Sequence, residues 1–145
     1  DRPEKDNFSI RLAEWQIDHA QLSEMRRKVF IQEQNIPEAL EWDEHAAVSL
    51  HALALDAQGN AIGTARLLAD GHIGRIAVIK PWRGKQVGSA LLNLLIILNK
   101  NRGAKEAVLS AQVQAIAFYQ RHGFVAEGEE YLDADIPHRL MRLKY

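Results

Sequence analysis

The segment that decides the fold lies in the middle of the chain, where residues 75–92 read RIAVIKPWRGKQVGSALL. Its first part, through Ile79, is rich in apolar and β-branched residues, which is typical of a buried strand. Its last part begins a helical period of apolar residues that extends to Arg102. Between them, Gly84 and Gly88 leave space at a turn, so a strand leads directly into a helix. The first amides of such a helix have no intrahelical partners, and a phosphate group would satisfy them.

Three cations, Lys80, Arg83 and Lys85, flank this turn. Together with the positive end of the helix dipole they favour a diphosphate or triphosphate group over a single carboxylate. A Walker A loop is excluded, because Ile79 stands at the position of its first glycine and Gln86 at that of its Ser or Thr. The G-x-G-x-x-G fingerprint of dinucleotide-binding proteins is also missing. The alternative is a plain glycine turn with solvated cations.

The remaining elements are strands before this segment and a strand–helix unit after it. Upstream we expect strands at 8–14, 48–56, 61–70 and 72–79, a helix from Asp18 to near Asn35, a loop over 34–47, and a hairpin turn at 57–60. Downstream we expect a strand at 106–111, a helix at 115–122 that ends at Gly123, and one or two strands around 124–131 and 138–144. This order predicts a mixed α+β domain.

Length and composition favour one domain over residues 1–145, since 47% of the 145 residues are hydrophobic and can bury one substantial core. The net charge of −1 provides no basic field for nucleic acid or for an anionic membrane surface. The absence of cysteine excludes disulfides, thiolate ligands and a cysteine nucleophile. The six histidines show no H-x-H or H-E-x-x-H spacing, so we expect no metal.

The longest apolar run, at 91–98, is interrupted by Asn93 and is shorter than the roughly 20 residues that cross a bilayer. The sequence starts at Asp1 without a basic, apolar leader, so we expect a trimmed start with no export signal and a cytoplasmic location. Edge strands would allow a homodimer, but no sequence feature determines the oligomeric state.

Two motifs resemble the GNAT superfamily of N-acetyltransferases. Arg83-x-x-Gln86-x-Gly88 is similar to the family's acyl-CoA pyrophosphate loop, although Gln86 replaces the usual first loop glycine. The second motif, which is similar to the family's later helix, is Ala115-x-x-Phe118–Tyr119 with the terminal pair Gly123–Phe124. The features that resemble the small bacterial ElaA-like branch are residues 29–34, Pro37, Glu41-x-Asp43 and residues 136–138.

The resemblance implies a central, mostly antiparallel sheet of six to seven strands with about four flanking helices. It also implies a V-shaped splay between two parallel strands, which match residues 72–79 and 106–111. Acetyl-CoA would be the acyl donor, with its pantetheine arm in the splay, and an amide near Ala77 or Val78 would polarise the thioester carbonyl. The cofactor-binding residues carried over are Ile76, Ala77, Val78, Arg83, Gly84, Lys85, Gln86, Val87, Gly88, Ser89 and Phe118.

The implied reaction is direct acetyl transfer to a primary amine of a small molecule or peptide through a ternary complex. Tyr119 matches the family's general acid, which protonates the departing thiolate. For the base that deprotonates the amine we rank Glu33 and His138 highest, ahead of Glu41, Asp43 and His45. Each of these residues also has a purely structural alternative, such as packing for Tyr119 or a strand-edge hydrogen bond for His138.

Two acidic segments, 33–44 and 127–135, each hold five acids and no Lys or Arg. If both border the acceptor pocket, they would attract a cationic amine, whereas solvated acidic loops are the alternative. Two other functions also stay open. One is a non-catalytic acyl-CoA-binding or sensing module of the same fold, and the other is a nucleotide-binding or phosphate-binding interaction domain.

Overall fold

Seven strands form one sheet in the part of the chain that the structure, a computed structural model, describes, namely residues 7–13 and 50–145. The strands are β1 (Phe8–Ala13), β2 (Leu50–Asp56), β3 (Ala61–Leu67), β4 (His72–Val78), β5 (Glu106–Gln112), β6 (Val125–Asp133) and β7 (Ile136–Lys144). The helices are α3 (Val87–Asn101), α4 (Ile116–Gln120) and the short 3-10 turns η3 (Lys80–Trp82) and η4 (Val113–Ala115).

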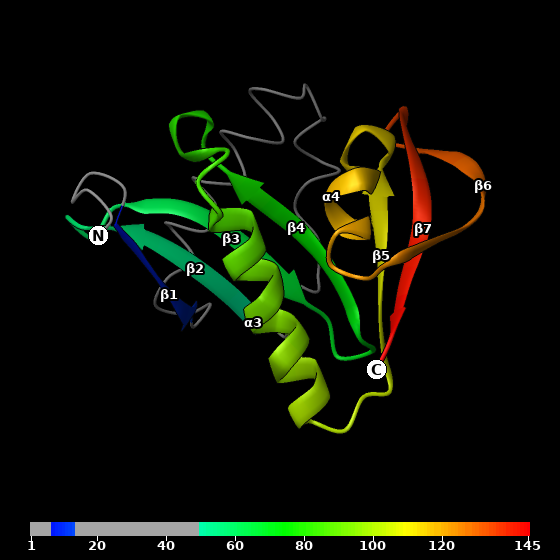
Figure 1. Cartoon of the computed structure of the whole chain (residues 1–145), viewed down its shortest axis with the longest axis horizontal. Helices are drawn as coiled ribbons and strands as arrows, with labels where there is room; N and C mark the ends of the chain where they lie inside the picture. Colours follow the sequence, from blue (N-terminus) through cyan, green and yellow to red (C-terminus); the bar gives the residue numbers. More distant parts are fainter. Residues whose placement is uncertain (1–6, 14–49) are drawn as a thin grey trace.

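The sheet has the order β1-β2-β3-β4-β5-β7-β6 and is antiparallel except between β4 and β5. Helices α3 and α4 lie on the same side of it (Figure 1). This arrangement confirms the mixed α+β class, the mostly antiparallel sheet and the central parallel pair that the sequence predicts.

The parallel pair is joined at one end only. Register pairs between β4 and β5 are His72 with Val108 and Ile73 with Leu109. Beyond these pairs β4 stays bonded to β3 as far as Val78, while β5 stays bonded to β7 as far as Gln112. The two strands therefore diverge toward their carboxyl ends, as Figure 1 shows, and the predicted V-shaped splay is confirmed.

Helix α3 covers the sheet over β2 to β5 and forms the core with it. Its apolar period buries Leu91, Leu92 and Leu95 completely. The helix approaches β3 closely because Gly63 has no side chain there. A Cβ at this residue would lie 3.0 Å from Leu91 Cδ1 and 3.1 Å from Val87 Cγ1.

The helix ends where the sequence predicts, since Gly103 has a φ of 91° and follows the last turn. The amide of Ala104 donates to the carbonyl of Asn99 at 3.2 Å, and that of Gly103 donates to Lys100 at 3.0 Å, which is the Schellman pattern. The predicted hairpin at 57–60 is also present, with Gly59 at a φ of 83°.

Two elements near the carboxyl terminus differ from expectation. The helix expected at 115–122 is the shorter α4, which follows η4 and gives way to a turn at residues 121–123. The last two strands are longer than predicted and form a hairpin through Ala134 and Asp135, whose φ angles are 54° and 63°. Such a turn usually carries Asn-Gly, so Ala-Asp provides no recognisable turn signal. The helix expected between Asp18 and Asn35 and the loop expected at 34–47 lie outside the described residues.

Hydrogen bonds around Asn99 hold the narrow end of the splay together. This buried side chain donates through Nδ2 to the carbonyl of Glu106 and to the hydroxyl of Tyr145, both at 2.9 Å. Arg102 donates to Asn99 Oδ1 and to the carbonyl of Leu68. The end of α3 is thus tied to the start of β5, the end of β3 and the last residue of the chain.

Within the described ranges, no helix has the length and apolarity to cross a bilayer.

Candidate active site

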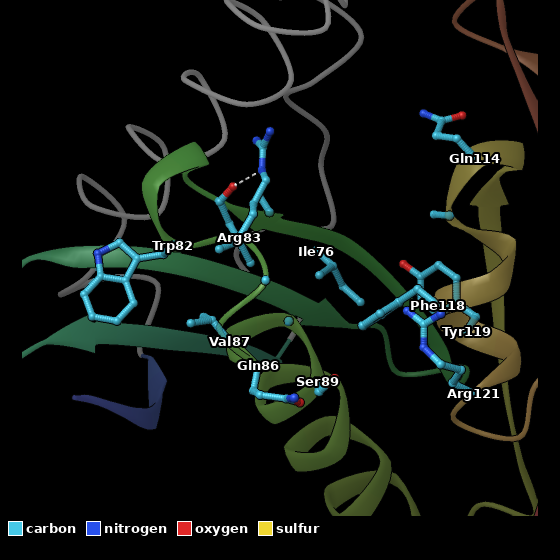
Figure 2. A pocket seen from close by; sticks show the side chains of 15 residues that line it. Ile76, Trp82, Arg83, Gln86, Val87, Ser89, Gln114, Phe118, Tyr119 and Arg121 are labelled. Atoms are coloured by element: carbon cyan, nitrogen blue, oxygen red, sulfur yellow. Dashed lines mark hydrogen bonds between the residues drawn. The ribbon is translucent and has the colours of Figure 1, made fainter. Parts of the chain in front are cut away.

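A cavity of about 600 Å³ lies between the diverging part of β4, the start of α3 and helix α4 (Figure 2). Fifteen residues line it: Ile76, Ala77, Val78, Trp82, Arg83, Gly84, Gln86, Val87, Gly88, Ser89, Gln114, Ala115, Phe118, Tyr119 and Arg121. The cavity therefore joins the diverging part of β4 to the amino end of α3.

This lining includes every residue predicted to bind the cofactor except Lys85. The ammonium group of Lys85 instead lies 5.9 Å from the centre of the Trp82 ring, in a cation–π contact. Arg83 lines the cavity, and its Nε donates to the carbonyl of Val78 at 2.9 Å. This bond ties the turn to the end of β4. The role of these residues as ligands stays a prediction.

The start of α3 presents amide groups to the cavity. The first hydrogen bond within the helix runs from the amide of Ala90 to the carbonyl of Gln86 at 3.0 Å. The amides of Val87, Gly88 and Ser89 therefore have no partner inside the helix, and the first turn has neither an acidic residue nor a side-chain cap. This geometry suits an anion.

Gln86, which replaces the usual first loop glycine, adopts a backbone conformation that suits glycine. Gln86 has a φ of 72°, in the left-handed region that a glycine adopts more readily, and Gly84 before it has a φ of 78°. The turn thus keeps a glycine-like course although it carries a side chain at this position.

Tyr119 projects from α4 toward the gap between the strands (Figure 2). Burial raises the pKa of Tyr119 to about 12, so the phenol stays protonated at neutral pH. The rings of Phe118 and Phe124 hold it by edge contacts, with centroids 5.1 and 6.0 Å away. Tyr119 therefore places a protonated hydroxyl beside the cavity, on a ring held by two neighbouring aromatic rings.

His138 lies one strand away from the cavity, on β7, opposite Gln112 at the wide end of the splay. It is 8% exposed, and its Nδ1 lies 2.6 Å from the carbonyl of Ile136. A carbonyl can only accept, so Nδ1 carries the proton and Nε2 of the neutral ring is the basic nitrogen. Gln114 of the cavity lining donates to Gln112, which connects this strand pair to the cavity.

The other candidates for the base, Glu33, Glu41, Asp43 and His45, lie outside the described residues, as does the acidic segment 33–44. In the second acidic segment, Glu127 forms an ion pair with Arg142 at 3.0 Å, so its charge is compensated. The exposed acids of that segment are Glu129, Glu130, Asp133 and Asp135. Among the described residues, no group of three or more His, Asp or Glu side chains is placed to hold a metal ion.

The sequence did not single out Trp82, Gln114 or Arg121 as parts of the site. Arg121 follows Phe118 by three residues, so helical spacing puts both on one face and could have identified it. Gln114 lies in η4, where no periodic signal exists.

Comparisons with known proteins agree with this geometry. Residues 16–145 match the family model described as "Acetyltransferase (GNAT) domain". The uncharacterized N-acetyltransferase YjcF of Bacillus subtilis is 37% identical over 121 residues, covering 81% of this chain and 86% of YjcF. Protein ElaA of Escherichia coli is 30% identical over 144 residues, covering 88% of this chain and 94% of ElaA.

Solved structures have the same fold. The crystal structure of Escherichia coli ElaA superimposes with a TM-score of 0.83 at 25% identity, covering 94% of this chain and 99% of that one. A putative streptothricin acetyltransferase from Bacillus anthracis, in complex with acetyl coenzyme A, has a TM-score of 0.58 at 24% identity, with 67% and 62% covered. The chain therefore belongs to the GNAT acetyltransferase family, with ElaA among its relatives, and is an acyltransferase.

Proposed function

We propose that this protein transfers an acetyl group from acetyl-CoA directly to a primary amine of a small molecule or peptide, with both substrates bound at once. The observation that carries the proposal is the cavity beside the diverging part of β4, which reaches the start of α3, where the first amides have no partner inside the helix. The neighbour crystallised with acetyl coenzyme A supports the choice of donor.

The residues present fit such a donor. One end of the cavity has the first amides of α3, and Arg121 lines the cavity on the side of α4, which suits a diphosphate. The other end has the edge of β4 at Ile76 to Val78, where no strand pairs on the β5 side. An extended pantetheine arm can bond to such an edge as an added strand does. When bound, acetyl-CoA supplies the acetyl group in an activated thioester.

Residues of the chain would orient the thioester and protonate the departing sulfur. A backbone amide near Ala77 or Val78 would donate to the thioester carbonyl and stabilise negative charge there. Tyr119 would donate its proton to the departing sulfur as negative charge develops there, and its raised pKa means that the phenol carries that proton at neutral pH.

His138 would accept the proton of the amine at Nε2, directly or through water, since Nδ1–H is held by the carbonyl of Ile136. Transfer then needs no covalent enzyme intermediate. The proposed mechanism uses no metal ion.

The experiment is steady-state acetylation of a broad amine panel by the wild-type protein and by Tyr119→Phe. We expect kcat to fall by about 10² to 10⁴-fold in the variant, while the affinity for acetyl-CoA stays the same, because only proton donation is lost. Tyr145→Phe is the matched control, since it removes a phenol hydroxyl at the narrow end of the splay. Wild-type binding of acetyl-CoA without acetylation of any amine would instead indicate a sensing module.

A further inference from the structure

A hydrogen bond joins helices α3 and α4 beside the cavity. Ser89 Oγ, in the first turn of α3, lies 3.0 Å from His122 Nε2, just after α4. Ser89 lines the cavity, and Figure 2 shows it at the start of α3, across from Phe118 and Arg121. The centre of the His122 ring lies 5.1 Å from that of Phe118.

The direction of this bond decides what Ser89 can offer to a ligand. A hydroxyl has one proton to donate. If His122 Nε2 lacks a proton, Ser89 gives its proton to the imidazole and has none for an anion. If Nε2 carries a proton, the imidazole donates to Oγ, and the hydroxyl proton of Ser89 can turn toward the cavity.

We propose that His122 is a positioning residue for the phosphate end of acetyl-CoA: its Nε2–H donates to Ser89, whose hydroxyl donates to a phosphate oxygen beside the first amides of α3. This inference rests on the proposed function and deepens it, since it assigns a role to a side chain that does not line the cavity. The pair acts as a relay of two donors, from His122 to Ser89 to the anion.

Nε2 carries a proton in only one tautomer of the neutral imidazole but always in the imidazolium, so protonation of His122 favours the relay and the affinity depends on pH. The groups that face the imidazole of His122 are the uncharged Ser89 of α3, and Phe118 and the cationic Arg121 of its own segment. Burial and, to a lesser extent, the charge of Arg121 lower the pKa of His122, so the imidazole is neutral in the free protein at pH 7. A phosphate near Ser89 raises this pKa again. Binding therefore takes up a proton, and affinity falls as the pH rises through the pKa of the bound state.

The experiment is calorimetric titration with acetyl-CoA between pH 5.5 and 8.5, using wild type, Ser89→Ala, His122→Leu, the double variant and His122→Gln. We expect Ser89→Ala and His122→Leu each to weaken binding about tenfold, as loss of one hydrogen bond to a charged group does. The double variant should bind no more weakly than either single variant. His122→Gln keeps an N–H donor without a titrating ring, so it should bind well at pH 8.

The pH dependence gives a readout that a purely structural role would not change. A phosphate ester also titrates, near about pH 6, and contributes the same slope to every variant. The wild-type protein should show an additional slope that is missing in His122→Gln and His122→Leu. His72→Gln is the matched control, because His72 lies at the narrow end of the splay, 3.0 Å from Asp70.

Two further ligands separate the possible sources of the phosphate. Acetyl-pantetheine has no phosphate, so all variants should bind it equally. Acetyl-dephospho-CoA lacks the 3′-phosphate and keeps the diphosphate. If the Ser89 and His122 variants also lose affinity for acetyl-dephospho-CoA, the relay contacts the diphosphate. If they bind this ligand as the wild-type protein does, the relay contacts the 3′-phosphate.

Three results would each overturn the proposal: losses of affinity that add in the double variant, losses with acetyl-pantetheine as large as those with acetyl-CoA, or a pH slope in His122→Gln equal to that of the wild type. Melting temperatures confirm that the variants are folded. Absence of binding to the wild-type protein would instead contradict the proposed function.

Discussion

Gln86 has an unfavourable backbone conformation at a functionally important turn. Its φ of 72° is left-handed, which costs a non-glycine residue about 1 to 2 kcal/mol. The conformation persists because Arg83 is bonded to Val78 on one side and α3 packs on the sheet on the other. The function of the turn therefore depends on the backbone conformation at residue 86 more than on the side chain there.

We therefore expect Gln86→Gly to raise the free energy of unfolding by about 0.5 to 1 kcal/mol, since relief of the left-handed φ exceeds the added chain entropy of glycine. Urea denaturation measures the change. Gln86→Ala keeps a Cβ and is the control, with an expected change within about 0.5 kcal/mol. Equal stabilisation by Ala and Gly would show that the side chain, and not the backbone, is the source of the strain.

At the same scale, His138 is expected to matter only while the amine is charged. His138→Gln should lower kcat by about 10² to 10⁴-fold near pH 7, with unchanged affinity for acetyl-CoA. The deficit should shrink as the pH approaches about 10, where an alkylamine loses its proton without help. A pH profile of kcat for one amine substrate measures this, and a deficit that is the same at every pH would exclude His138 as the base.

At the scale of elements, the contact between α3 and β3 positions the phosphate turn. Gly63 allows Val87 and Leu91 to approach the strand, and Val87 is the first residue of α3. The helix start, whose first amides have no partner inside the helix, is thereby held next to the end of β4. Packing of this helix therefore determines where the proposed anion site lies.

Gly63→Ala should lower the free energy of unfolding by about 1 to 3 kcal/mol, because the added Cβ would lie 3.2 Å from the carbonyl oxygen of Ala77 and closer still to two side chains. Gly74→Ala is the matched control in the same sheet. A Cβ there would meet nothing within 4 Å, so its effect should be small or stabilising. Equal destabilisation by both substitutions would refute this account of the close packing.

Elements with a strong local signal were predictable from the sequence. Helix α3 has an apolar period and a terminal glycine, and the β2–β3 turn has Gly59, so both were located within a few residues. The β6–β7 turn was missed because Ala134 and Asp135 give no local signal, and the conformation there follows from strand pairing on both sides. The length of helix α4 was overestimated mainly at its carboxyl end, because the turn that closes at Gly123 already begins at Arg121.

At the scale of the whole molecule, the site depends on the divergence of β4 and β5. The network of Asn99, Tyr145 and Arg102 holds the narrow end, while separate partners, β3 and β7, keep the strands apart at the wide end. No local pattern at Asn99 indicates this role, because its partners are distant in the sequence. The splay itself was predicted through family resemblance, whereas the Ser89–His122 bond follows only from the packing of α3 on α4.

The most direct test of the central claim is amide hydrogen exchange of the wild-type protein with and without saturating acetyl-CoA. If the splay holds the pantetheine arm and the start of α3 holds the diphosphate, protection should increase in residues 76–89 and at α4, and stay unchanged in the β2–β3 hairpin. Binding of acetyl-CoA without protection of β4 and the turn, or with protection confined to other segments, would contradict the account.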